Sequence, residues 1–144
     1  MKGMWLAALV FVSAGACAQS NSLLGNWRNP TGSTIQIYPC GSLVCARLVG
    51  TRKDAPSRVD AKNPNSALRS RPLCGLEIGT NFRLVKPGRA EDGRLYDPES
   101  GNTYSGSMTL DGNKLKLRGY IGLALLGRTE VWTRAPVGFV PCRP

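Results

Sequence analysis

Asp97 and Glu99 are the first candidates for chemistry, because two neighbouring carboxylates can act as acid and base or can hold calcium. Their spacing argues against both roles. Catalytic carboxylates face each other across a cleft, whereas these two share one turn, and a calcium loop needs more oxygen ligands. The chain also has no histidine, so the usual base for acyl transfer is missing. We therefore expect no enzymatic activity and no cofactor.

Four of the five cysteines lie beyond residue 18, and they are expected to pair in an oxidising compartment. Four cysteines allow three connectivities. We favour Cys40–Cys45, which flanks a short turn, and Cys74–Cys142, which would fasten a proline-rich tail. The alternative is a metal site, but zinc ligands need closer cysteine pairs or histidine partners, so we expect no metal.

Residues 1–18 have the pattern of a secretory signal peptide. Lys2 precedes an apolar run, Met4–Val12, and small residues follow up to an expected cleavage site after Ala18. The run is far shorter than the roughly 20 residues of a membrane-spanning helix. The sequence thus predicts a location outside the cytoplasm, so the protein is expected to be periplasmic or secreted. The alternative is a lipoprotein anchored at Cys17.

The remaining residues, 19–144, suffice for one domain with a tail at 135–144. The whole chain carries a formal net charge of +10. Such a charge favours anionic partners, such as the lipid headgroups or acidic polysaccharides of an envelope surface. Export makes nucleic acid an unlikely partner.

Alternating apolar and polar residues predict two hairpins. The first joins residues 34–38 and 43–48, and the second joins 105–110 and 114–118 through the turn Asp111-Gly112-Asn113. Shorter strands are expected near Trp27 and over residues 77–84, 94–96, 102–104 and 129–134. Eight to ten short strands with regular turns predict an all-β protein that is either a barrel or a sandwich, and closure into a barrel would remove the exposed edges.

Two segments interrupt this rhythm. Residues 51–72 form a long connection with six cations against two carboxylates. Asn63 before Pro64 has the pattern of a helix cap followed by a first-turn proline, which predicts at most one short helical turn, ending at Leu68. Residues 121–127 are apolar where a polar turn is expected. This run either folds inward as core or is exposed at a lipid surface or a cavity lip.

The first and the last of the expected strands resemble the lipocalin pattern. Gly25-Asn26-Trp27 opens the first strand, and Trp132-Thr133-Arg134 closes the last. The resemblance implies that Trp27 plugs one end of the barrel and that an arginine packs across its indole. We pair Trp27 with Arg134, and Arg128 is the second choice.

Nearly all of residues 19–144 resemble a bacterial family known as domain of unknown function 2147. The resemblance implies an exported, lipocalin-like protein, a single small antiparallel up-and-down β-barrel, with no assigned reaction. The chain departs from the pattern at Cys74 and in the tail through Cys142, which suggests a private second disulfide. The matching motifs, in chain order, are Gly25-x-Trp27, Ile37-Tyr38-Pro39-Cys40-Gly41, Leu43-Val44-Cys45, Asp60, Asn63-Pro64, Arg71-Pro72-Leu73, Gly75-Leu76, 93–99, Gly101, 103–106, 115–120, Gly127-Arg128-Thr129 and Trp132-Thr133-Arg134.

Several matched positions are candidates for a ligand site. Their phenol, amide and carboxylate groups can converge on a small polar ligand, and a nearby arginine can add charge. The alternative is structural, since Asp and Asn often cap turns and strand tyrosines often pack against cross-strand neighbours. The candidates are Asp60, Asn63, Tyr96, Asp97, Tyr104 and Arg118.

The function that these features favour is the binding of a small amphiphile or anionic lipid in the barrel, between an apolar lining and a cationic rim. The alternative is an envelope or secreted interaction protein. It would dock on anionic surfaces or on a protein partner through the basic segment 51–72.

Overall fold

The structure is a computed structural model that describes residues 22–143. The expected signal peptide, residues 1–18 with Cys17, lies outside the described residues. The described part contains eight strands and two single-turn 3₁₀ helices. In chain order they are β1 (Gly25–Arg28), β2 (Thr34–Cys40), β3 (Leu43–Gly50), η1 (Ser66–Leu68), β4 (Glu77–Lys86), β5 (Arg89–Asp97), β6 (Asn102–Asp111), β7 (Lys114–Tyr120), η2 (Ala124–Leu126) and β8 (Arg128–Arg134).

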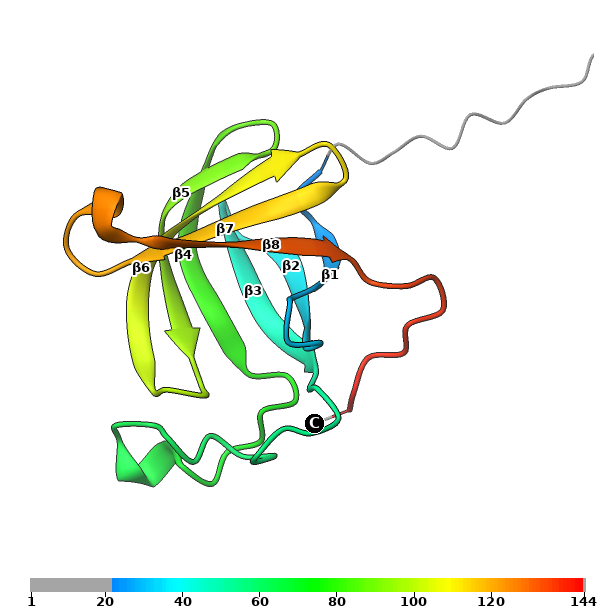
Figure 1. The fold of residues 1–144 in the computed structure, drawn as a ribbon, viewed down its shortest axis with the longest axis vertical. Coiled ribbons are helices and arrows are strands. Elements are labelled where there is room, and N and C mark those ends of the chain that lie inside the picture. The colour runs from blue at the N-terminus through cyan, green and yellow to red at the C-terminus, as the bar shows by residue number, and fades with distance from the viewer. Residues whose placement is uncertain (1–21, 144) are drawn as a thin grey trace, which may run out of the picture.

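Each strand pairs antiparallel with the next one in the chain, and β8 pairs with β1 to close the barrel (Figure 1). The expected all-β up-and-down barrel is therefore confirmed. No helix of residues 22–143 is long and apolar enough to cross a membrane. In the loop 51–72 the single helical turn begins after Asn65, whose side chain accepts from the Ala67 amide. The prediction that Asn63 caps this turn was wrong, because the Asn63 side chain instead accepts from the Asn65 amide.

The core follows from the alternation of side chains along each strand. Along β7, for example, Leu115 and Leu117 point inward and Lys114, Lys116 and Arg118 point outward. The alternation breaks in β4 and β5, where Asn81 and Asp92 both have a φ of 61° and the strand register shifts nearby. The largest side chains with less than 2 % exposure are Trp27, Phe82, Ile35, Ile37, Met108 and Leu115.

Two disulfides fasten the barrel's periphery. Cys40–Cys45 crosslinks β2 and β3 beside their turn, and Cys74–Cys142 ties the C-terminal tail to the segment before β4. This is the connectivity that we favoured from the spacing. The tail also contacts β3, because the Cys142 amide donates to the Val49 carbonyl at 2.7 Å.

The two ends of the barrel differ. The short β2–β3, β4–β5 and β6–β7 hairpins share one end with Trp27. The opposite end carries the β1–β2 loop, the long segment 51–76, the β5–β6 turn and the β7–β8 loop with η2 (Figure 1). In that last loop Ile121, Leu123, Leu125 and Leu126 are exposed, Leu125 by 86 %, so the interpretation that this run folds inward as core was wrong.

Candidate functional site

Trp27 plugs one end of the barrel. Its side chain is fully buried, and its Nε1 donates to the Leu23 carbonyl at 2.8 Å. The Arg134 guanidinium carbon lies 3.8 Å from the ring centroid of Trp27, and the same guanidinium donates to the Leu24 and Ser22 carbonyls. A Cβ at Gly25 would lie 3.0 Å from Arg134, and the φ of 117° there also favours glycine. This end of the barrel is therefore sealed by packing and hydrogen bonds.

The opposite end opens into a cavity of about 600 Å³. This volume lies within the usual range of ligand sites, roughly 300–1,000 Å³. The barrel is thus not filled by its own side chains. The deeper wall is apolar and is formed by Ile35, Leu48, Ile78, Leu95, Leu117 and Trp132.

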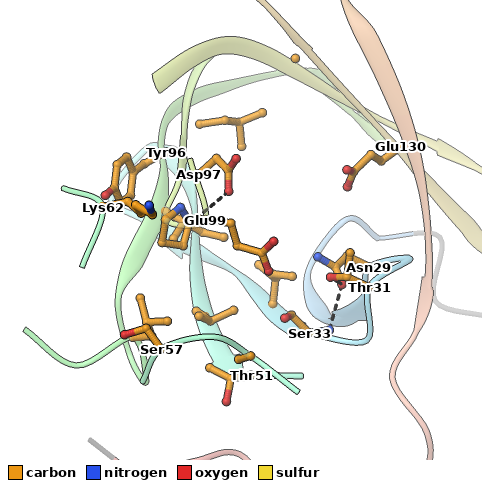
Figure 2. Close-up of a pocket in the computed structure, with 18 of the residues that line it drawn as sticks. Asn29, Thr31, Ser33, Thr51, Ser57, Lys62, Tyr96, Asp97, Glu99 and Glu130 are labelled. Carbon is orange, nitrogen blue, oxygen red and sulfur yellow. Dashed lines mark hydrogen bonds between the residues drawn. The ribbon is translucent and has the colours of Figure 1, made fainter. Parts of the chain in front are cut away.

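The rim of the cavity carries charges of both signs. Figure 2 shows Asp97 and Glu99 on one side of the space and Glu130 on the opposite side. The only cations among the described lining residues are Lys62 and Arg128. The expectation of a cationic rim was therefore wrong, because the cations of this end lie mainly outside the cavity wall.

Most of the rim carboxylates already have partners. Glu99 pairs with Arg52 at 3.1 Å, and Asp97 accepts from the Glu99 amide and the Ser100 hydroxyl. Asp97 thus caps its own turn, as the structural alternative suggested. Because these carboxylates are paired, the rim offers hydrogen-bonding groups to a ligand but no strong net electrostatic field.

Glu130 is a lining residue that the sequence analysis missed. Its Oε2 accepts from Trp132 Nε1 at 2.9 Å, and its Oε1 lies 3.1 Å from Arg128. Side chains two apart on a strand share a face, so the buried Trp132 could have identified Glu130 as inward-facing. The carboxylate is held at the wall with its side chain 31 % exposed.

Asp60 organises a second polar cluster behind the cavity wall. The carboxylate is completely buried and accepts from Tyr96, from Asn63 Nδ2 at 2.8 Å and from Arg71 Nε at 2.8 Å. Asn63 also lies 3.3 Å from the Tyr96 hydroxyl, and its carbonyl accepts from Arg69. The cluster therefore anchors the long loop to β5.

The candidate residues fall into three groups. Tyr96 and Asp97 line the cavity, and so does Tyr104. Asp60 and Asn63 converge on Tyr96, but their polar groups bind one another rather than face the cavity. Arg118 lies on the outer face of β7, because Leu117 takes the inward position, so it does not belong to the cavity.

The Asp60 cluster sets the ionisation of its members. Burial raises the pKa of Asp60, but the hydrogen bonds from Tyr96, Asn63 and Arg71 outweigh it, so the pKa of Asp60 is lowered. Burial, followed by the hydrogen bond to the Asp60 carboxylate, raises the pKa of Tyr96 to about 12. The phenol is thus held neutral as a hydrogen-bond donor.

This raised pKa predicts a loss of stability in alkali. A tyrosine pKa near 10 in the unfolded chain and about 12 in the fold means that the contribution of Tyr96 is complete below pH 10. It is lost as the pH rises toward 12. In urea unfolding across this range, the wild type should lose stability more steeply than Tyr96→Phe. Tyr38→Phe removes another tyrosine with a raised pKa and serves as the comparison. Equal slopes of stability against pH for wild type and Tyr96→Phe would contradict the prediction.

Comparison with known proteins places this barrel among lipocalin-like folds. One similar solved structure is that of protein HP1028 from the human pathogen Helicobacter pylori, which is described as belonging to the lipocalin family. The TM-score is 0.74 with 20 % sequence identity, over 81 % of this chain and 84 % of that one. At this identity the similarity shows the fold.

No curated protein sequence matches the chain. A family model does match it over residues 25–134, which span the barrel from the first residue of β1 to the last of β8. The chain therefore belongs to DUF2147, a family described as uncharacterized protein conserved in bacteria.

Proposed function

We propose that the protein binds one small amphiphile, with the apolar tail inside the barrel and the polar head at the rim. The observation that carries this proposal is the cavity of about 600 Å³, sealed at one end by Trp27 and open at the other. An aliphatic chain would contact Leu117, Leu95 and Ile78 and so leave water. The fold and the family, which has no assigned reaction, favour binding over catalysis.

The rim narrows the chemistry of the head. Asp97, Glu99 and Glu130 outnumber the lining cations Lys62 and Arg128, and ion pairs offset much of this charge. An anionic head would find no concentrated positive charge there. The rim therefore favours an uncharged head with several hydrogen-bonding groups over the anionic lipid that the net charge of the chain suggested.

A bulky residue inside the cavity tests the binding site. Leu117→Trp places an indole in the apolar wall, and we expect it to weaken binding of the neutral probe N-phenylnaphthylamine by about tenfold or more, since tail and indole compete for one space. The measurement is a fluorescence titration. Val131→Trp adds the same group to the outer face of β8 and should leave the affinity unchanged. Equal affinities for the two variants would contradict the cavity as the site.

A matched ligand series tests the head. Lauric acid, its glycerol monoester and dodecylamine share the tail length and differ in charge. In displacement titrations at neutral pH we expect the monoester to bind more tightly than the fatty acid anion. Glu130→Gln should improve the fatty acid and weaken the amine while leaving the ester unchanged, because only a charge is removed.

We infer in addition that the protein works outside the cytoplasm. Two disulfides fasten the described part of the chain, and such bonds persist mainly in oxidising compartments. Alkylation of the native protein purified from its own cells tests this inference. Protein with four free thiols beyond residue 18 would contradict it.

A further inference from the structure

The loop between β7 and β8 presents a tip of exposed aliphatic side chains. Ile121 and Leu123 are each 69 % exposed, Leu125 is 86 % exposed and Leu126 is 77 % exposed. No charged residue interrupts this stretch from 121 to 127. Single exposed aliphatic residues are common on proteins, but four large ones within six positions need an explanation.

The tip is held in place and is not a loose excursion. The Leu126 amide donates to the Leu123 carbonyl at 3.0 Å within η2. Arg118, which also bonds Thr129 Oγ1, donates from Nη2 to the Leu125 carbonyl at 3.3 Å. The aliphatic side chains are therefore displayed outward by hydrogen-bonded backbone.

The tip and the basic loop 51–72 both belong to connections at the open end of the barrel. Gly119 and Arg128, which flank the β7–β8 loop, line the cavity mouth together with Thr51, Ser57 and Lys62 from the basic loop. In Figure 1, η2 projects at the upper left and the η1 loop lies at the lower left, so the two project from the barrel at separate points. Segment 51–72 carries six cations and two carboxylates, so the end that carries the tip also carries positive charge.

We propose that the barrel docks mouth-first on an anionic lipid bilayer. The side chains of Ile121, Leu123, Leu125 and Leu126 enter the boundary between headgroups and acyl chains, while the basic loop 51–72 lies against the anionic headgroups. Aliphatic insertion together with attraction to anionic lipid is the usual combination for binding at a membrane surface. This docking is independent of whether the cavity holds a ligand.

A bilayer fits this tip better than a protein partner. Stable protein interfaces bury about 800 Å² on each side and depend on Trp, Tyr and Arg anchors, with Leu under-represented. The tip is small, projects from the barrel and contains only aliphatic residues and glycine between positions 121 and 127. A fluid acyl layer adapts to such a shape without a complementary pocket.

Unpaired peptide groups in a short loop limit how deep the tip can go, because hydrocarbon offers them no partners. The insertion is therefore confined to the interfacial region. In this position the cavity mouth faces the lipid, so the docking would place the mouth beside a source of amphiphiles.

Vesicle flotation tests the proposal. We would use residues 19–144, which include every described strand and the whole described core, with vesicles of phosphatidylcholine alone or mixed with phosphatidylglycerol. We expect binding to the mixed vesicles that weakens as salt rises. The variant Leu123→Ser/Leu125→Ser should lower the partition coefficient about tenfold.

The matched control removes two exposed aliphatic residues elsewhere. Leu84 is 52 % exposed in β4 near the sealed end, and Val131 is 42 % exposed on the barrel wall. Leu84→Ser/Val131→Ser should bind mixed vesicles as the wild type does. Equal loss in both double variants, no loss in the tip variant, or no binding by the wild type would overturn the proposal.

A tryptophan probe reports insertion directly. Leu125→Trp should show a blue-shifted emission when mixed vesicles are added, whereas Val131→Trp should not. An unshifted emission from Leu125→Trp with bound protein would overturn insertion of the tip. The probe titration of the cavity in the absence of vesicles reports separately on ligand binding, so one proposal can fail without the other.

Discussion

Replacing Asp60 with alanine is expected to lower the free energy of unfolding by about 3 kcal/mol at neutral pH. The carboxylate is fully buried and accepts hydrogen bonds from Tyr96, Asn63 and Arg71. Its removal leaves these donors without their acceptor. The expected loss is at the lower end of the range for buried ion pairs, because Arg71 is 36 % exposed and can regain water.

The measurement is urea unfolding of Asp60→Ala beside Asp54→Ala. Asp54 belongs to the same loop and also contacts an arginine, but its side chain is 80 % exposed, so its loss should change stability by less than about 0.5 kcal/mol. Hydrogen exchange of residues 51–72 should quicken only in Asp60→Ala. Equal effects of the two variants would show that the cluster does not anchor the loop.

Acid should reduce the advantage of Asp60. Its pKa is lowered in the fold, so its contribution is complete above the ordinary carboxyl pKa and is lost as the pH falls through the folded value. The difference in stability between wild type and Asp60→Ala should therefore narrow below about pH 4.

Replacing Gly93 with alanine is also expected to destabilise the fold by about 3 kcal/mol. A Cβ at this position of β5 would lie 2.2 Å from Phe82 Cε1 and 2.4 Å from Cζ. The Phe82 ring has no exposed surface, so it cannot move aside into solvent. The substitution must therefore shift the ring or the strand.

Two further variants isolate this contact. Phe82→Leu should be tolerated better in the Gly93→Ala background than in the wild type, with a coupling energy above about 1 kcal/mol. Gly119→Ala is the control, because its Cβ would meet Tyr104 at an ordinary 3.7 Å. Thermal or urea unfolding measures all of them, and additive effects of the Phe82 and Gly93 changes would refute the steric account.

The sequence predicts this fold well where side-chain alternation is regular. The turn Asp111-Gly112-Asn113 predicts the hairpin of β6 and β7, and the structure pairs Asp111 with Lys114 across it. Alternation fails where a bulge lies. Asn and Asp adopt a positive φ more readily than other side chains, but the sequence does not indicate that Asn81 and Asp92 do so within strands. The inward positions of Phe82 and Gly93 could therefore not be assigned.

The site was less predictable than the fold. Tyr96 and Tyr104 are placed by the β5–β6 turn, which the sequence indicates. The ion-pair partner of Asp60 is Arg71, one of six cations in the loop 51–72, and no spacing rule selects it. The sign of the rim was wrong for a similar reason, since net charge says how many cations a chain has but not where a loop places them.

The junction of β1 and β8 has a consequence for how the barrel forms. Seven of the eight strand pairings join neighbours in the chain, whereas this one rests on two residue pairs, Trp27 with Arg134 and Arg28 with Thr133. The Arg134 side chain there reaches Ser22, 112 positions away. Because closing a long loop costs entropy, we expect the β1–β8 pairing to form after the hairpins, from an open sheet with two unpaired edge strands. Unpaired edge strands can pair with a second chain. We therefore expect that the Trp27–Arg134 contact, by holding β1 and β8 together, also protects the protein from self-association during folding.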